Sequence, residues 1–105
     1  MNSSNCIFCK IVSKELPSDI VYENEDVLVF RDIHPKAPVH ILIIPKQHIE
    51  SINSAGSENV AGDLILSAKD IIKRDNVRGC KLLFNVGREG GQTVDHLHMH
   101  LLCQS

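Results

Sequence analysis

Hydrophobic and polar residues follow two periods along this chain, and each period predicts a type of element. Apolar residues at every third or fourth position predict a short helix over 5–14, ended by Pro17, and a long helix over 59–73. Alternating or continuous apolar segments predict five strands, over residues 20–25, 27–32, 40–46, 81–87 and 96–102. Two prolines place residues 32–38 in a loop, and Ser57 is the predicted N-cap of the long helix.

These elements predict an α+β fold. Five strands with mostly short connections favour a five-stranded antiparallel sheet with one long and one short helix, both packed on one side of the sheet. The sequence contains no repeat and no composition change at a boundary, so residues 1–105 are predicted to form a single domain. The apolar stripe on the long helix of so small a chain predicts a homodimer.

Composition and charge exclude several classes of function. Hydrophobic residues make up 43% of the chain, yet no apolar run approaches the length of a membrane span. The first residues lack the charged and apolar regions of a targeting peptide, so we expect a cytoplasmic protein without a membrane partner. The net charge is −2 and the basic residues are scattered, which is not the pattern of a nucleic-acid-binding protein.

Residues 96–102 alternate histidine with apolar residues. Side chains of a strand point alternately to opposite faces, so His96, His98 and His100 are predicted to share one face, with apolar residues on the other. An ordinary half-buried strand is the simple alternative, which the strict register after Gly-Gly-Gln-Thr disfavours. The outer two histidines of a regular strand lie about 13 Å apart, too far to share one metal ion, so we expect them to have different roles.

The four cysteines stand at positions 6, 9, 80 and 103. Cys6 and Cys9 form a C-x-x-C pair, which in a cytosolic chain is more often a metal or redox site than a structural disulfide. Cys80 and Cys103 have no comparable partners, and we expect them to be small core or surface residues.

Residues 96–102 match at every position the pattern His-φ-His-φ-His-φ-φ, where φ is apolar, and this pattern is the signature of the histidine triad family. Other segments resemble family landmarks in family order: Cys-Ile-Phe-Cys-Lys-Ile, Phe-Arg-Asp-Ile, Ala-Pro-Val-His, Ile-Pro-Lys-Gln-His and Gly-Gly-Gln-Thr. The resemblance covers essentially the whole chain. Its N-terminal segment and Gly-Arg-Glu-Gly-Gly-Gln are similar to the bacterial-type Hint branch, which hydrolyses nucleoside phosphoramidates. Gly-Gln-Thr-Val is equally typical of the branch that cleaves dinucleoside polyphosphates.

The resemblance implies a division of labour among the histidines. His98 would attack the α-phosphate and form a nucleotidyl-histidine, which water then hydrolyses. His100 would contact a phosphate oxygen or place a proton on the leaving amine, and His40 would support the nucleophile. Hydrogen-bond donors for the phosphate are predicted at Asn85, Gly91, Gln92 and Thr93. No catalytic metal is required.

At the nucleoside end, Asp32 resembles the family carboxylate that accepts hydrogen bonds from the ribose hydroxyls. The base slot is predicted to be lined by Ile7, Phe8, Ile11, Phe30 and Ile33. Each of these apolar residues is read equally well as part of the core. Apolar contact with the base suggests a purine nucleotide as the substrate.

The same resemblance implies a zinc site. Cys6 and Cys9, with His48 and His96, match the ligands of a structural Cys₂His₂ zinc site in bacterial family members. Two thiolates and two neutral imidazoles balance Zn²⁺ and leave no open position, so its role would be to fix the first helix to the sheet. The alternative is that the two cysteines only pack the edge of that helix.

The function predicted from these residues is hydrolysis of the P–N bond of purine nucleoside 5′-phosphoramidates. The alternatives are dinucleoside polyphosphate hydrolysis, and a nucleotide-binding or scaffold protein with vestigial activity. Few residues follow the triad, whereas Hint-branch relatives commonly have a longer C-terminal tail that shapes the part of the site that receives the leaving group. We therefore expect this part of the site to differ from that of those relatives.

Overall fold

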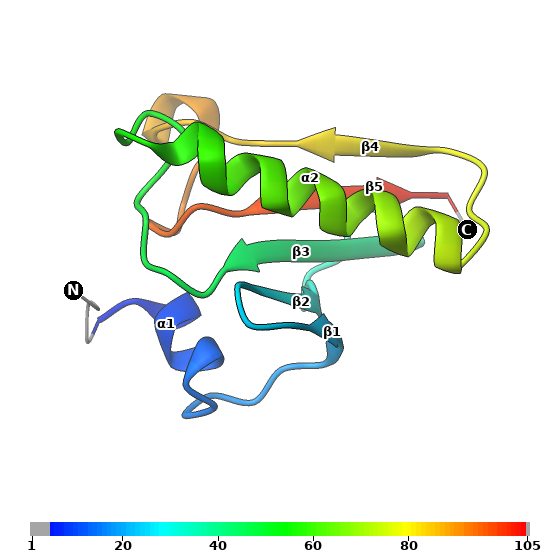
Figure 1. The fold of residues 1–105 in the computed structure, drawn as a ribbon, viewed down its shortest axis with the longest axis horizontal. Coiled ribbons are helices and arrows are strands. Elements are labelled where there is room, and N and C mark those ends of the chain that lie inside the picture. Colours follow the sequence, from blue (N-terminus) through cyan, green and yellow to red (C-terminus); the bar gives the residue numbers. More distant parts are fainter. Residues whose placement is uncertain (1–4, 105) are drawn as a thin grey trace.

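The computed structural model describes residues 5–104 and contains one antiparallel sheet with helices on both faces (Figure 1). The sheet order is β1-β2-β3-β5-β4. The elements are α1 (Ile7–Val12), β1 (Ile20–Glu23), β2 (Val27–Arg31), β3 (Val39–Pro45), α2 (Ser57–Arg74), β4 (Cys80–Leu83), the 3₁₀ helix η1 (Arg88–Gly90) and β5 (Met99–Cys103). The predicted five-stranded α+β fold is confirmed. Residues 1–4, part of the segment predicted to lack a targeting signal, and Ser105 lie outside the described residues.

The β1–β2 hairpin turns at Asn24, as the sequence predicts. The Asn24 side-chain oxygen accepts hydrogen bonds from the backbone N–H groups of Asp26 and Val27, each at 2.8 Å. An asparagine that bonds its own backbone two and three residues ahead stabilises a tight turn. The hairpin places β2 beside β3, the central strand, which in turn pairs with β5.

The helix α2 covers one face of the sheet and forms the larger core cluster. Its apolar stripe, including Leu64, Ala68 and Ile71, packs against alternate residues of the strands such as Val29 and Ile43. Within residues 5–104, no helix is both long and apolar enough to span a membrane.

The N-terminus of α2 differs from the prediction in detail. Ser57 is the first helical residue, and Gly56 precedes it with a φ of 79°, in the left-handed region that glycine tolerates. The Ser57 hydroxyl donates a hydrogen bond to the carbonyl of Ile52 and so ties the linker to the helix. The serine acts on the linker and does not cap the helix.

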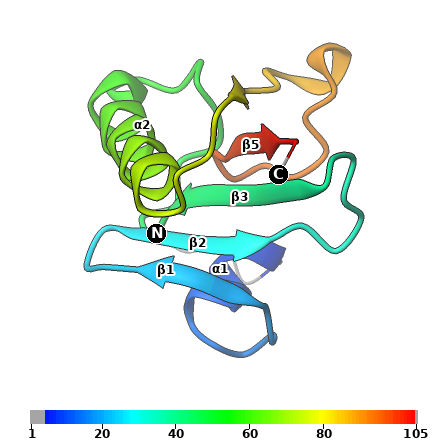
Figure 2. The ribbon, with the colours of Figure 1, turned by 90° about the vertical axis from the view of Figure 1, so that its right-hand side faces the viewer.

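The short helix α1 lies on the opposite face of the sheet from α2 (Figure 2). Phe8 and Ile11 of α1 pack against Leu28, Phe30 and Leu42, which alternate with the strand residues that α2 covers. The expectation that both helices cover one side is therefore wrong. The strand β2 is buried on both faces and carries apolar residues continuously from Val27 to Phe30, which is the pattern of a doubly covered strand.

The triad segment is only partly a strand. β5 begins at Met99, so His96 lies in a bend and His98 in the segment that leads into the strand, and only His100 lies in the strand itself. The predicted separation of faces nevertheless holds: Met99 belongs to the α2 cluster, as do Leu97 and Leu101. The rings of His96 and His98 instead contact Phe8, on the α1 side.

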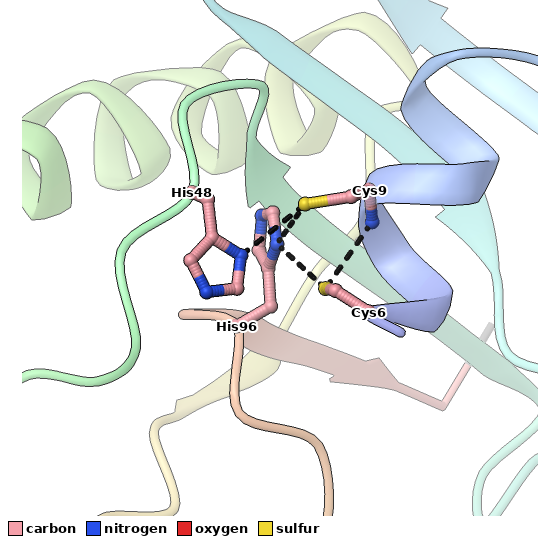
Figure 3. A group of neighbouring side chains, drawn as sticks. All are labelled: Cys6, Cys9, His48 and His96. Carbon is pink, nitrogen blue, oxygen red and sulfur yellow. Dashed lines mark hydrogen bonds between the residues drawn. The ribbon is translucent and has the colours of Figure 1, made fainter. Parts of the chain in front are cut away.

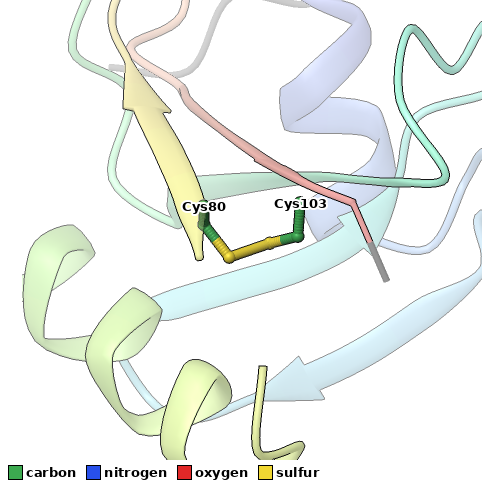
Figure 4. Close-up of a disulfide and its surroundings, with 2 residues drawn as sticks. All are labelled: Cys80 and Cys103. Carbon is green, nitrogen blue, oxygen red and sulfur yellow. A yellow bond between two sulfur atoms is a disulfide. The ribbon is translucent and has the colours of Figure 1, made fainter. Parts of the chain in front are cut away.

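A disulfide joins Cys80 to Cys103 (Figure 4). The two residues are direct partners in the β4–β5 ladder, and their Cα atoms are 4.2 Å apart. This corrects the expectation that both are unpaired. The pairing depends on strand register across a separation of 23 residues, which residue spacing alone does not reveal.

Candidate functional site

Backbone geometry fixes the tautomer of His98. Its Nδ1 lies 2.7 Å from the carbonyl oxygen of His96, so Nδ1 carries the hydrogen and donates it. The other ring nitrogen, Nε2, then has a free lone pair. Burial lowers the pKa of His98, which keeps the imidazole neutral near neutral pH. A neutral imidazole with one nitrogen fixed and the other free has the properties of a nucleophile.

A second chain of hydrogen bonds fixes His40 and His100. The backbone N–H of Lys36 donates to Nδ1 of His40 at 3.0 Å, so the hydrogen of His40 is on Nε2. His40 Nε2 donates in turn to Nδ1 of His100 at 2.9 Å, which leaves the hydrogen of a neutral His100 on its Nε2. Burial lowers the pKa of His100 to about 4. His100 therefore presents an N–H donor where His98 presents a lone pair.

These two imidazoles open into one cavity of about 360 Å³. His98 and His100, with ring centroids 5.1 Å apart, form part of its wall together with Thr93 and Asp32. All five residues predicted for the base slot also line it, namely Ile7, Phe8, Ile11, Phe30 and Ile33. His40 is buried behind His100, and its Nε2 lies 3.4 Å from a carboxylate oxygen of Asp32. The cavity thus combines apolar side chains with imidazoles and a carboxylate.

The loop before the triad uses most of its polar groups to hold its own shape. The Gln92 side chain is buried and donates both amide hydrogens, to the carbonyl oxygens of Glu50 (2.7 Å) and Val94 (3.0 Å). Its oxygen accepts from the backbone N–H of Gly87 at 3.0 Å. The Gln92 amide therefore links the loop at residue 50 to the loop before the triad through hydrogen bonds. The sequence predicts a different role for this amide, as a hydrogen-bond donor to phosphate.

Asn85 and Gly91 also support this loop. The Asn85 amide donates to the carbonyl of Gly90 at 2.8 Å, and Gly91 adopts a φ of 90°. A Cβ atom at Gly91 would lie 3.3 Å from the Asn85 amide nitrogen, so this close approach also favours glycine. Of the four residues predicted to contact phosphate, Thr93 lines the cavity, and Asn85, Gly91 and Gln92 do not.

Sequence reasoning missed several contacts of the site. The backbone N–H of Lys36 and the carbonyl of His96 set two tautomers, and a motif of side chains carries no signal for either. Arg88 bridges the loop by donating to the carbonyl of Gln92 at 2.6 Å and to the carboxylate of Asp95 at 2.8 Å. Arg88 and Asp95 carry opposite charges but lie seven residues apart in the sequence, on either side of a glycine turn, and only the fold brings their side chains together.

The four predicted metal ligands converge at the start of α1 (Figure 3). Sγ of Cys6 lies 3.3 Å from Nδ1 of His96, and Sγ of Cys9 lies 3.2 Å from Nδ1 of His48 and 3.6 Å from that of His96. Zn–S bonds of about 2.3 Å and Zn–N bonds of about 2.05 Å give a sulfur–nitrogen edge of about 3.6 Å in a tetrahedral site. The side chains therefore match the size of a Cys₂His₂ metal site.

The orientation of His96 also fits metal ligation. Its Nε2 donates to the carbonyl oxygen of Pro45 at 2.8 Å, which leaves the lone pair on Nδ1, the atom that faces the two sulfurs. Metal-bound histidines commonly donate their second N–H in this way, which fixes the ring and the tautomer. Burial lowers the pKa of His96 to about 4, so the ring is in the neutral form that a ligand requires.

Comparison with known proteins places this architecture. A family model described as the C-terminal binding region of the scavenger mRNA decapping enzyme matches residues 5–105. The purine nucleoside phosphoramidase of Escherichia coli K12 is 48% identical over 100 residues, which cover 91% of this chain and 84% of the relative. A 14 kDa zinc-binding protein of Zea mays is 44% identical over 107 residues, with 97% and 84% covered.

A solved structure supports the same assignment. The histidine triad protein of Clostridium difficile superimposes with a TM-score of 0.94 at 38% sequence identity, covering 100% of this chain and 95% of the other. The match extends over both helices and the whole sheet, and the triad, the cavity and the cysteine pair lie within it. The chain belongs to the histidine triad family.

Proposed function

We propose that this protein hydrolyses the P–N bond of purine nucleoside 5′-phosphoramidates through a nucleotidyl-histidine at His98. The observation that carries the proposal is the fixed Nδ1–H tautomer of His98, which leaves Nε2 as a lone-pair donor at a cavity of nucleotide size. A general base is not needed to generate this nucleophile, because burial already keeps it neutral.

The hydrogen-bond chain supplies the rest of the reaction. His98 Nε2 attacks the α-phosphorus, the P–N bond breaks, and the electron pair of that bond leaves with the amine. The leaving nitrogen carries its proton from the start, because the substrate reacts in its N-protonated form, and it departs as a neutral amine. The Nε2–H of neutral His100 donates a hydrogen bond to a phosphate oxygen, and the Nε2–H of His40 holds the His100 ring in this tautomer. Water then attacks the phosphorus of the nucleotidyl-histidine, the bond to His98 Nε2 breaks, the proton of the water passes to solvent, and neutral His98 and the nucleoside monophosphate result. Each half-reaction inverts the phosphorus, so the overall result is retention.

The cavity wall supports a nucleoside as the bound group. Phe8 and Phe30 meet edge to face with centroids 5.6 Å apart and provide an aromatic surface for a base. Asp32 lines the same cavity with a carboxylate oxygen 3.4 Å from Nε2 of His40, and this carboxylate can accept hydrogen bonds from the two ribose hydroxyls. A purine offers more stacking area than a pyrimidine, which favours purine nucleotides.

Charge favours a phosphoramidate over a polyphosphate. Among the described residues that line the cavity, Arg31 is the one fixed cation, and it pairs with Asp19 at 3.2 Å. A polyphosphate leaving group brings several negative charges that need cationic partners, whereas an amine brings none. The name of the E. coli relative, purine nucleoside phosphoramidase, agrees with this choice.

The direct test compares two substrates with one purified protein. We expect adenosine 5′-phosphoramidate to be cleaved with a kcat/KM at least about 10-fold above that for diadenosine polyphosphate. The reason is that the cavity lacks cations to pair with the negative charges of a polyphosphate leaving group, whereas an amine needs none. Faster cleavage of the polyphosphate would support the alternative substrate class. Binding of adenosine monophosphate without hydrolysis of either substrate would instead support a nucleotide-binding or scaffold role.

Zinc is the metal we propose for the cysteine and histidine cluster. The support is the donor set, the tetrahedral spacing and the second hydrogen bond of His96. The zinc-binding relative from Zea mays agrees with it. With all four positions filled by protein, the ion would stabilise the fold and hold α1 against the sheet, and the proposed reaction needs no catalytic metal.

A second copy of this chain is the partner we propose for the edge of the sheet. β4 is an edge strand with an unpaired backbone side, and Leu82 and Leu83 are each 43% exposed on it. The helix α2 also exposes two apolar residues, Ile65 and Leu66. An exposed apolar edge is a site for strand pairing, and an edge that pairs with its own copy forms a closed two-fold dimer.

We expect sedimentation of the wild-type protein to give the mass of two chains. Leu82→Glu places a charge in the proposed interface and should give a single-chain mass, whereas Ile20→Glu, at an exposed apolar residue of the opposite edge strand β1, should not. A monomeric wild-type protein would contradict the dimer.

A further inference from the structure

His96 joins the proposed metal site to the nucleophile through two different groups. Its side-chain Nδ1 lies 3.3 Å from Sγ of Cys6, and its backbone carbonyl accepts the hydrogen bond from His98 Nδ1 at 2.7 Å. The position of this carbonyl decides which nitrogen of His98 carries the hydrogen. A ligand that fixes the side chain of His96 therefore also restricts the group that orients His98.

Phe8 provides a second connection, from the other side of His98. It lies in α1 between Cys6 and Cys9, and its side chain is buried. The Phe8 ring meets His98 edge to face, with centroids 5.1 Å apart and an interplanar angle of 85°, and it meets His96 at 5.9 Å and 76°. The carbonyl of His96 holds one nitrogen of His98, and the Phe8 ring limits rotation of the imidazole about its χ2 bond.

The position of Phe8 depends on contacts outside its own helix. α1 has six residues, fewer than an isolated helix needs to be stable in water. Cys6 stands at its N-cap and Cys9 one turn later, so both thiolates needed by the metal flank Phe8. Ligation of both cysteines to histidines of the sheet region would fix the distance between α1 and the triad segment.

We propose that Phe8 is a positioning residue for the nucleophile, and that metal ligation by Cys6 and Cys9 sets its position against His98. The inference rests on the proposed function, in which His98 attacks phosphorus. It extends the role of the metal from fold stability to the geometry of the reaction centre, although the metal contacts no substrate. It also separates two roles of Phe8, as a wall of the base slot and as a contact of the nucleophile.

Phe8→Leu tests the positioning role in the zinc-loaded protein. The matched control is Phe84→Leu, which removes a partly buried ring that packs on the α2 side of the sheet. Three quantities are measured: zinc per chain, the ¹⁵N NMR signals of the His98 ring without substrate, and kcat at saturating phosphoramidate. For Phe8→Leu we expect unchanged zinc, a mixture of His98 tautomers in place of one, and a kcat lower by about 10-fold. The control should retain the single tautomer and the wild-type kcat.

Two results would overturn the proposal. A Phe8→Leu protein with the wild-type His98 tautomer and kcat, even with a raised KM, would show that Phe8 is only a wall of the base slot. A metal-free wild-type protein that remains folded and keeps the single His98 tautomer would show that ligation does not set the position. Failure of the proposed function would look different, because the wild-type protein would then not hydrolyse phosphoramidates while the NMR signals still report the position of His98.

Discussion

Replacing His98 with alanine is expected to abolish hydrolysis while leaving nucleoside monophosphate binding nearly unchanged. The variant loses Nε2, the lone-pair atom at the cavity, and no other described histidine of the cavity is fixed in the same tautomer. His100 presents an N–H to the cavity in place of a lone pair. It could act as a nucleophile only in its other tautomer, which the hydrogen bonds from Lys36 to His40 and from His40 to His100 disfavour. Removal of a catalytic nucleophile lowers kcat by about 10³-fold or more.

Binding should survive because the affinity comes from other parts of the cavity. The apolar surface at Phe8 and Phe30 and the carboxylate of Asp32 are still present when the His98 imidazole is removed. The measurement is kcat with adenosine 5′-phosphoramidate beside the Kd of adenosine monophosphate, for wild type and variant. Thr93→Val is a matched control, since it changes a cavity residue without touching the proposed nucleophile.

A covalent intermediate gives an independent check on the same prediction. Wild-type protein denatured at alkaline pH during turnover should retain labelled nucleotide, because a phosphorus–nitrogen bond to histidine survives base. The His98→Ala protein should retain none. Wild-type turnover rates in the variant, or equal labelling of both proteins, would exclude His98 as the nucleophile.

The sequence predicts the site best where chemistry depends on local spacing. Alternation places His98 and His100 on the face opposite Met99, and this holds even though β5 begins three residues later than predicted. The C-x-x-C spacing of Cys6 and Cys9 predicts a metal or redox site, and in the structure both sulfurs lie at the start of α1 together with two histidines. In each case the relevant residues lie within one turn or a few strand positions of each other.

Features that depend on register or on backbone groups could not be predicted in this way. The Cys80–Cys103 disulfide requires the register of β4 on β5, and the two residues carry no local pattern. Gln92 fits a phosphate site by residue type, but its amide hydrogens are donated to the backbone carbonyls of Glu50, 42 residues away, and of nearby Val94. The side of the sheet that α1 covers depends on the direction of the chain between residues 13 and 19, which periodicity does not encode.

Cys6→Ser combined with Cys9→Ser is expected to abolish zinc binding and to lower stability substantially. Serine hydroxyls do not provide the thiolate charge that offsets Zn²⁺, so the remaining histidines cannot retain the ion. If the ion is present at about 1,000 times its Kd, its loss removes about 4 kcal/mol from the free energy of unfolding. For a domain of this size we expect a fall in Tm of roughly 15 °C or more.

The design of this test must separate the metal from the packing of two buried sulfurs. Cys6 and Cys9 are 8% and 7% exposed, so serine also costs some stability by placing hydroxyls in an apolar cluster. Thermal unfolding is therefore measured for wild type and variant, each with excess zinc and with EDTA. Zinc should raise the Tm of the wild-type protein and leave that of the Cys6/Cys9 variant unchanged. The difference in Tm between the two proteins that persists in EDTA measures the packing cost.

Cys80→Ser with Cys103→Ser provides the matched control, because it replaces the same number of sulfurs and breaks the disulfide on the other face of the sheet. This control should lose stability and yet bind zinc with wild-type stoichiometry and show the wild-type response to EDTA. Wild-type protein without bound zinc, or with the same Tm in zinc and EDTA, would favour the alternative that Cys6 and Cys9 only pack the helix. The six unfolding measurements, on three proteins each in zinc and in EDTA, thus assign the stabilising effect to the ion, to the sulfur packing or to the disulfide.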